Sequence, residues 1–89
     1  MWTINEALDS VARQRKSDIA IVDGAQRIRY DELRRRVKHT AAWLQAQGIG
    51  KGDKVALHGR NSAAWVIAYY AILDIGAVAV PVNHKLAAP

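Results

Sequence analysis

The polar segment His58-Gly59-Arg60-Asn61-Ser62 is the first place in the sequence where chemistry could occur, because it joins an expected strand to an expected helix. The amino end of a helix presents free backbone N–H groups, and Arg60 would add positive charge, so such a loop can bind an anion. The competing interpretation is a helix capped by Asn61 or Ser62 beside a solvated arginine. No histidine and acid accompany Ser62 in a triad arrangement, and no nucleophile elbow surrounds it, so we expect no nucleophile here.

Three closely spaced glycines, Gly48, Gly50 and Gly52, resemble a nucleotide-binding loop at first sight. A dinucleotide-binding loop leaves a strand and opens a helix, so that the amino end of the helix faces the pyrophosphate. Here the glycines leave an expected helix and lead into an expected strand. This order favours a helix cap followed by a turn, and no Walker-type phosphate loop is present.

Two other groups of residues have both a functional and a packing interpretation. The run Arg34-Arg35-Arg36 could contact nucleic acid, but no interleaved aromatic residues accompany it. We therefore expect a solvated or interdomain face and no nucleic-acid partner. The aromatic residues Trp65, Tyr69 and Tyr70 could line a ligand pocket, but their spacing on an apolar helix favours core packing.

Composition narrows the class of protein further. There is no cysteine, and His39, His58 and His84 lie far apart, so we expect no metal site. The net charge of +5 fits an anionic partner, or a cut through a larger protein whose acidic part lies elsewhere. The longest apolar run, Ala63 to Leu73, is too short to span a bilayer, and no secretory signal is visible. We expect a cytoplasmic protein without a transmembrane segment.

The elements that must position these residues alternate between helix and strand. Thr3 and Glu6 suggest a capping box, Asp31 is the expected cap of the second helix, and Gly48 is its expected left-handed end. The pair Asp23-Gly24 predicts a hairpin turn. The first expected helix is residues 4–15, the second runs from the cap Asp31 to its end at Gly48, and the third runs from the cap Asn61 or Ser62 to Leu73 or Asp74. The expected strands are residues 18–22, 27–30, 54–58 and 77–82.

These elements predict an α/β fold with helix, β-hairpin, helix and then a right-handed parallel βαβ unit. Two parallel strands do not make a complete sheet, and a single helix cannot cover both of its faces. The chain has 89 residues, whereas a typical domain has about 100–150. We therefore interpret the chain as a fragment with an incomplete sheet.

Four stretches follow one another along the chain: Ile28 to Leu33, Gly48 to Ala56, Asn61-Ser62 with Trp65, and Ala71 to Asn83. In this order they resemble the amino-terminal region of the adenylate-forming superfamily, also called the AMP-dependent synthetases and ligases. Acyl-CoA synthetases, aryl-CoA ligases, luciferases and peptide-synthetase adenylation domains belong to it. The resemblance implies that residues 1–89 are the amino-terminal part of the large domain of an acyl-CoA synthetase, truncated and without the carboxyl-terminal domain.

The resemblance also implies a reaction for the parent enzyme. A carboxylic acid, fatty or aryl, attacks the α-phosphate of Mg-ATP to give an acyl-adenylate, and a thiol, usually that of CoA, then displaces AMP. ATP, Mg and CoA are thus implied for the parent. The family's phosphate-binding loop, its adenine and ribose motifs and its carboxyl-terminal lysine are all absent here, so we expect no catalytic residue, no metal and no activity in the chain alone.

One residue is carried over from the family as a possible contact. After Val82-Asn83 the family usually has proline and then a basic residue, whereas this sequence has His84 and then Lys85. In some CoA-using members that basic position lies near the nucleotide phosphates of CoA, so the resemblance implies that Lys85 contacts a CoA phosphate. The competing interpretation is a solvated lysine. For the whole chain, the alternative is a free-standing small α/β interaction module without catalysis.

Overall fold

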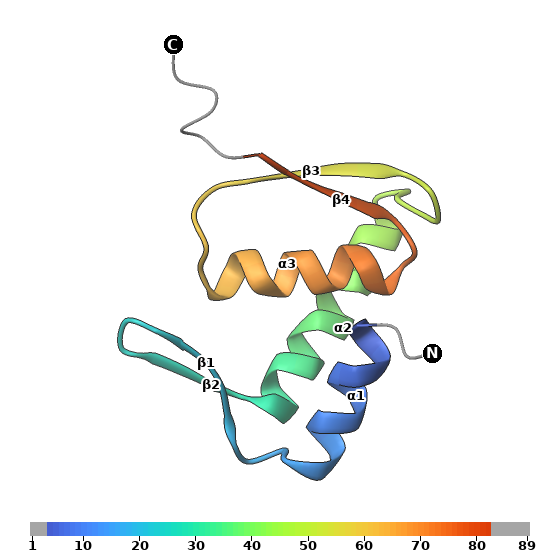
Figure 1. Ribbon diagram of the computed structural model, residues 1–89. Coiled ribbons are helices and arrows are strands. Elements are labelled where there is room, and N and C mark those ends of the chain that lie inside the picture. The colour runs from blue at the N-terminus through green and yellow to red at the C-terminus, as the bar shows by residue number, and fades with distance from the viewer. Residues whose placement is uncertain (1–3, 83–89) are drawn as a thin grey trace.

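A computed structural model describes residues 4–82 of the chain. The elements are α1 (Ile4–Gln14), β1 (Ile19–Asp23), β2 (Gln26–Arg29), α2 (Tyr30–Ala46), β3 (Lys54–His58), α3 (Ala63–Asp74) and β4 (Val78–Val82). Figure 1 shows β3 and β4 on one side of α3, α1 and the hairpin on the other, and α2 running past both. The predicted order of elements is confirmed, and the expected capping role of Thr3 lies outside the described residues.

The hairpin is built on a two-residue loop. β1 and β2 pair antiparallel, and Asp23 lies opposite Gln26, so Gly24 and Ala25 form the loop between them. Gly24 has a φ of 60°, as the first loop position of a type II′ hairpin requires. Each strand is displaced by one residue from its predicted position, because the turn follows Asp23 and does not include it.

The start of α2 differs from the prediction. Tyr30, expected in the strand, is the first helical residue, and Asp31, expected to be the cap, lies in the first turn. The N-cap is Arg29, which makes no side-chain capping bond. Instead the N–H of Tyr30 donates to the Asp18 carbonyl at 3.0 Å, and that of Asp31 to the Lys16 carbonyl at 3.2 Å. Since these carbonyls satisfy two of the free N–H groups of the helix, a side-chain cap is not needed.

Two hydrophobic clusters hold the elements together, and both α2 and α3 contribute to each. The buried residues of the first cluster are Leu8, Ile28, Leu33, Val37, Ala63 and Ile67. Those of the second are Ala41, Leu44, Ala71, Ile72 and Ala77. The apolar stripe predicted for the second helix is buried along its whole length, so α2 and α3 together form the spine of the molecule.

Both spine helices end in the same backbone motif. The glycine after the C-cap has a positive φ, 90° at Gly48 and 78° at Gly76. At α2 the N–H of Gly48 bonds to the Gln45 carbonyl at 3.0 Å, and that of Ile49 to the Leu44 carbonyl at 3.2 Å. The corresponding two bonds that close α3 are each 3.1 Å long. This is the Schellman motif, and it confirms the predicted left-handed end at Gly48.

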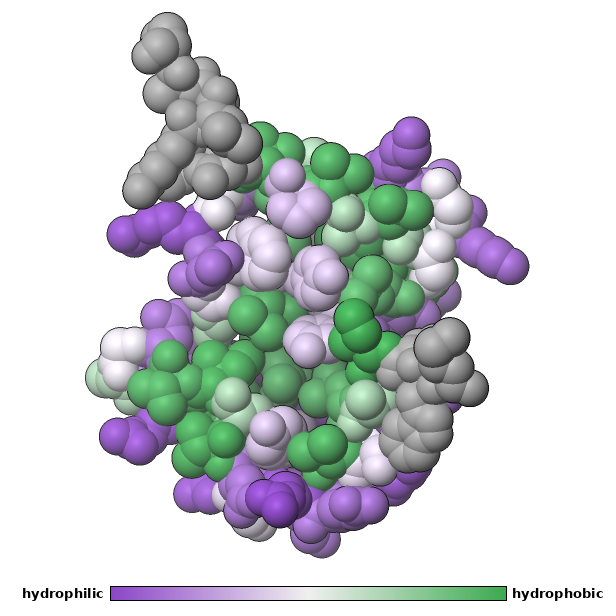
Figure 2. Space-filling model, viewed as in Figure 1, coloured by the Kyte–Doolittle hydropathy of each residue, from purple (hydrophilic) through white to green (hydrophobic). Residues whose placement is uncertain are grey.

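β3 and β4 pair in parallel, which confirms the parallel strands of the predicted βαβ unit. The strand begins at Val78 because Ala77, expected to be its first residue, takes part in closing α3. Val55 and Ala79 pack into the second cluster, whereas Val78 and Val80 are 46% and 41% exposed. Figure 2 shows hydrophobic residues at the surface near β3 and β4, at the top of the view. Residues 4–82 therefore cover one face of the sheet and leave the other bare, although parallel sheets are normally covered on both.

Candidate functional site

The sheet edge at which β3 and β4 end is the candidate functional site. His58 is paired with Val82, so the carboxyl ends of both strands lie at the same edge. In open α/β sheets, ligands bind in the space outside this edge. His58 and Arg60 are both exposed here, and the chain continues from Val82 toward Lys85. Lys85, the residue for which the sequence suggested a ligand contact, lies outside the described residues.

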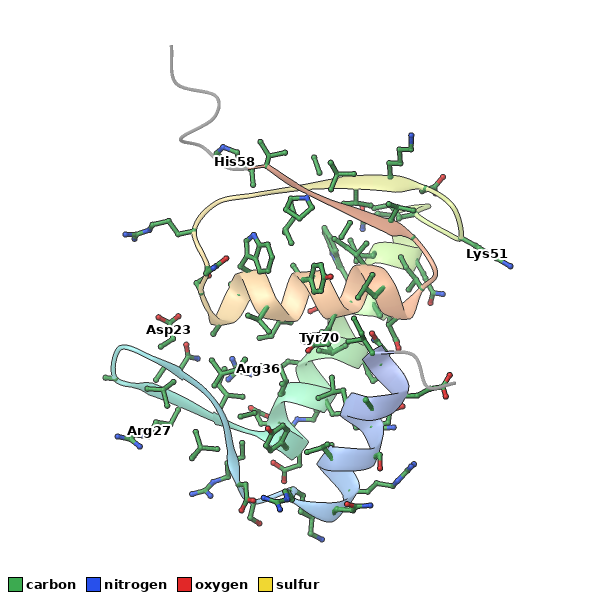
Figure 3. All side chains as sticks on the ribbon, viewed as in Figure 1. Asp23, Arg27, Arg36, Lys51, His58 and Tyr70 are labelled. Carbon is green, nitrogen blue, oxygen red and sulfur yellow. The ribbon has the colours of Figure 1, made fainter. Side chains whose placement is uncertain are left out.

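The loop from β3 to α3 is organised around the start of the helix. Ser62, and not Asn61, is the N-cap, and its Oγ accepts a hydrogen bond from the Trp65 N–H at 3.2 Å. The Oδ2 atom of Asp23 accepts a second one from the Ala63 N–H at 3.0 Å. In Figure 3, Asp23 lies between the hairpin and the start of α3. Because a carboxylate of the chain already occupies this helix end, where negative charge is favourable, the capped-helix interpretation is preferred to an external anion site.

The arginine run makes its contacts within the chain. Arg34 Nε lies 3.0 Å from Asp9 Oδ1, which links α2 to α1. Arg35 and Arg36 both pair with Glu32 one turn earlier, and Arg36 Nε is 3.3 Å from Glu32 Oε1. Such exposed pairs contribute about 0–1 kcal/mol each. Arg35 and Arg36 are therefore solvated, one of the two interpretations that the sequence left open, whereas Arg34 is half-buried against α1.

The three aromatic residues of α3 pack mainly on one another. The rings of Trp65 and Tyr69 are stacked, with centroids 5.4 Å apart and an interplanar angle of 7°. Tyr70 meets Tyr69 edge to face at 5.9 Å and also packs against the first hydrophobic cluster. Figure 3 shows Tyr70 on the side of α3 that faces α1 and α2. All three residues are half-buried, but only Tyr70 packs against a hydrophobic cluster, so the core-packing interpretation is supported for Tyr70, whereas Trp65 and Tyr69 belong to neither cluster.

The glycine segment is a turn that ties the starts of the two parallel strands together. The N–H of Gly50 donates to Asp53 Oδ2 at 2.8 Å, which shapes the turn. The N–H of Gly52 donates to the Gly76 carbonyl at 3.0 Å, and that of Val78 to the Asp53 carbonyl at 2.7 Å. The predicted cap and turn are confirmed, and these glycines lie at the end of the sheet opposite the candidate site.

A polar node that joins the three helices was not predicted. Asp74, the last residue of α3, accepts from Lys38 Nζ at 2.9 and 3.1 Å and from Asn5 Nδ2 at 3.1 Å. Asn5 also donates to the Tyr70 carbonyl at 3.0 Å. A carboxylate at the carboxyl end of a helix is unfavourable without a cation nearby. The position of Asp74 at the end of an otherwise apolar helix was the one sequence feature that could have suggested a nearby cation. Nothing in the sequence identified Lys38 as that cation.

Neither Mg²⁺ nor the triphosphate of ATP fits the residues that the structure describes. Among residues 4–82, no three His, Cys, Asp or Glu side chains are grouped so that they could hold a metal ion. The amino end of α3 is occupied by its own Ser62 and Asp23. In the same range, no helix combines the length and the apolar character needed to cross a bilayer.

The sequence profile of the AMP-binding enzymes matches residues 8–89. The chain belongs to the AMP-binding enzyme family. It is 36% identical over 86 residues to a CoA ligase of Rhodococcus jostii that is named for a 7a-methyl-1,5-dioxo-octahydro-indenyl propanoyl group, and 38% identical over 78 residues to a feruloyl-CoA synthase of Amycolatopsis. The matched residues are 97% and 88% of this chain, but they span 17% and 16% of the length of those two relatives.

A solved structure shows the same fold. The N-terminal subdomain of NpsA from Klebsiella oxytoca is 30% identical and superimposes with a TM-score of 0.92. The match covers all of this chain and 23% of that one. The α/β architecture and the resemblance to the amino-terminal region of adenylate-forming enzymes are thereby confirmed, and the two-stranded sheet corresponds to a small part of the larger NpsA subdomain.

Proposed function

We propose that this chain is the amino-terminal part of an AMP-forming acid–CoA ligase. The observation that carries the proposal is the family match over residues 8–89, and the two relatives named as a CoA ligase and a feruloyl-CoA synthase support CoA as the acceptor. In the proposed reaction a carboxylate oxygen attacks the α-phosphorus of Mg-ATP and pyrophosphate leaves. The thiol of CoA then attacks the acyl carbonyl, and AMP leaves. The substrate class is a fatty or aryl carboxylic acid, and the proposed location is the cytoplasm.

The role that we propose for this part of the enzyme is structural support and delivery of a basic residue. The parallel register brings the ends of β3 and β4 to one edge, and Lys85 follows Val82 by three residues. An extended chain advances about 3.3–3.6 Å per residue, so the Lys85 Cα can lie no more than about 11 Å from that of Val82. A lysine within this reach is a flexible point charge for a phosphate at the edge of the sheet.

Replacing Lys85 by alanine in an enzyme that contains this chain tests the role in CoA binding. A phosphate contact contributes about 0.2–1 kcal/mol when exposed and about 1.5–3 kcal/mol when charge-assisted and partly dry. The KM for CoA should therefore rise by about 1.4-fold to 150-fold. Adenylate formation, measured by ATP–pyrophosphate exchange, should be nearly unchanged because it precedes CoA binding.

The matched control is Lys51→Ala. Lys51 is an exposed lysine at the opposite end of β3 from His58, as Figure 3 shows, and its removal should leave the KM for CoA unchanged. An equal loss in both half-reactions, or an unchanged KM for CoA, would contradict the proposed contact and favour the interpretation of Lys85 as a solvated lysine. Transfer to a carrier-protein thiol in place of CoA would refute the proposed acceptor but leave the ligase family intact.

The chain by itself should be inactive. Since the start of α3 is occupied by Asp23 and residues 4–82 hold no group of metal-binding side chains, we expect no ATP–pyrophosphate exchange with fatty or aryl acids above background. Exchange that follows the 89-residue protein through several purification steps would contradict this proposal. The matched control is the 89-residue chain with Lys85→Ala, which should also show no ATP–pyrophosphate exchange above background.

A further inference from the structure

The loop between β3 and α3 contains a cation that has no assigned role in the proposed reaction. Arg60 is exposed and follows His58, the last residue of β3, by two positions. Among residues 4–82, Arg60 takes part in no hydrogen bond and no ion pair, whereas the arginine run of α2 is paired with carboxylates. The charge of Arg60 is therefore available at the edge of the sheet where β3 and β4 end.

Three features fix the course of this loop. Gly59 has a φ of 125°, a backbone conformation that favours glycine, so the first turn of the loop is set by this residue. Ser62 caps α3 at the other end of the loop. The third feature comes from the hairpin, because the carboxylate of Asp23 accepts a hydrogen bond from the Ala63 N–H at 3.0 Å (Figure 3). The loop is thus held by a glycine turn, a local cap and one contact with a distant residue.

The contact of Asp23 can be removed without unfolding the hairpin. A cavity of about 200 Å³ lies between the hairpin and the loop, with Asp23 on one side and Asn61 on the other. This space gives the loop room to shift when the hydrogen bond from Ala63 is lost. The hairpin itself stays attached to the first cluster through Ile28, which is 2% exposed. We therefore expect the loss of Asp23 to move the loop and to leave the packing of the hairpin in place.

We propose that Arg60 is a second contact for the phosphates of CoA and that Asp23 is the residue that positions it; the inference rests on the proposed CoA ligase function. His58 pairs with Val82, so Arg60 and Lys85 follow neighbouring strand ends, by two and three positions respectively. CoA carries several phosphate charges, and a guanidinium can donate two parallel hydrogen bonds to one phosphate. The arginine side chain makes this contact, and not the start of α3, whose N–H groups are already capped.

Kinetics of an enzyme that contains this chain test both roles. Arg60→Ala should raise the KM for CoA about fivefold or more and leave ATP–pyrophosphate exchange nearly unchanged, because adenylate formation precedes CoA binding. Asp23→Ala should raise the KM for CoA about threefold or more, because the loop is no longer held in place. Asp23→Asn keeps an acceptor oxygen and should stay within about twofold of the unaltered enzyme. Since asparagine also removes the negative charge, a change that came from charge alone would appear in both variants.

The double variant shows whether the two residues act together. If Asp23 acts through Arg60, Asp23→Ala should change the KM for CoA of the Arg60→Ala enzyme by less than about twofold. The matched control is Asp31→Ala, which removes another exposed carboxylate that accepts from a backbone N–H in the first turn of a helix, here that of Glu32 at 2.7 Å. Asp31 lies at the start of α2, so its removal should leave the KM for CoA unchanged. Circular dichroism checks that each variant keeps its helices.

Several results would overturn this inference and leave the ligase function intact. They are an unchanged KM for CoA in Arg60→Ala, equal changes in Asp23→Ala and Asp23→Asn, full additivity in the double variant, and a loss of ATP–pyrophosphate exchange equal to the loss of thioester formation. The proposed function fails through a different observation, namely that the unaltered enzyme forms no CoA thioester from any fatty or aryl acid. That result would remove the inference together with the function on which it rests.

Discussion

The hairpin side of α3 and the outer face of the sheet differ in how far their apolar residues are covered. On the side of α1 and the hairpin, Ile28 and Val37 are 2% and 1% exposed within the first cluster. On the side of the sheet, Val78 and Val80 remain 46% and 41% exposed on the face of β4 that no described residue covers. The apolar residues on the hairpin side are therefore covered by other residues of the chain, whereas the outer face of the sheet exposes an apolar surface.

This difference predicts which residues determine the free energy of unfolding and which determine self-association. Burial of apolar surface is worth about 25 cal/mol per Å², so the two buried clusters, and not the outer face of the sheet, should contribute most of the free energy of unfolding. An uncovered apolar sheet face is a surface through which proteins associate. We expect substitutions on the hairpin side to change stability and substitutions on the outer sheet face to change self-association.

The largest expected effect is that of Ile28→Ala. Ile28 is among the most deeply buried side chains of the described residues, and truncation of a buried isoleucine costs about 2–5 kcal/mol. Urea unfolding followed by circular dichroism measures the loss. The control is Val22→Ala on the neighbouring strand, where the side chain is 61% exposed and the expected change is within about 0.5 kcal/mol. Equal losses at the two positions would remove the contrast between the regions.

An intermediate effect is expected for Asp23→Ala, which removes a contact between the hairpin and α3. The Ala63 N–H loses its acceptor, and loss of a cap costs about 0.5–2 kcal/mol. Hydrogen exchange should show faster exchange in the first turn of α3, with little change at its carboxyl end. Asp23→Asn keeps an acceptor oxygen and should retain most of the protection. Uniform acceleration along the whole chain would show that Asp23 supports the fold generally and not this helix end.

The smallest stability effect is expected for Val80→Thr on the outer face of β4. The side chain is already 41% exposed, so the free energy of unfolding should change by no more than about 0.5 kcal/mol. Self-association of the isolated chain, measured by sedimentation velocity, should decrease because the face becomes more polar. A stability loss comparable to that of Ile28→Ala would mean that this face is covered within the chain itself.

The features that the sequence predicted best are those set by local pattern. The stripe from Leu33 to Leu44 repeats at helical spacing and is buried as predicted. Gly48 and the Asp23-Gly24 pair marked a helix end and a turn because glycine tolerates positive φ. The parallel strands followed from the strand, helix, strand order, and the handedness of the unit stays a prediction.

The features that the sequence did not predict depend on contacts between distant residues. Asp31 was expected to cap the second helix, but the carbonyls of Lys16 and Asp18 take over that role through tertiary hydrogen bonds. Asp23 gave a turn signal and no sign of its bond to Ala63, which lies 40 residues away in sequence. At the candidate site, the register of β3 and β4 shows at which edge of the sheet both strands end. The contact between Lys85 and a CoA phosphate stays a prediction.

The hydrogen bonds between the two turns that precede β3 and β4 have a consequence for natural variation. The bonds from Gly52 to Gly76 and from Val78 to Asp53 fix where both strands begin. Removing one residue from the segment between Gly48 and Asp53 would strain these bonds, and a shift of β3 by one position in response would reverse the face of every side chain on it. Val55 would then point away from the second cluster. During divergence this segment can exchange residues more easily than it can gain or lose them, so insertions should be found in other loops.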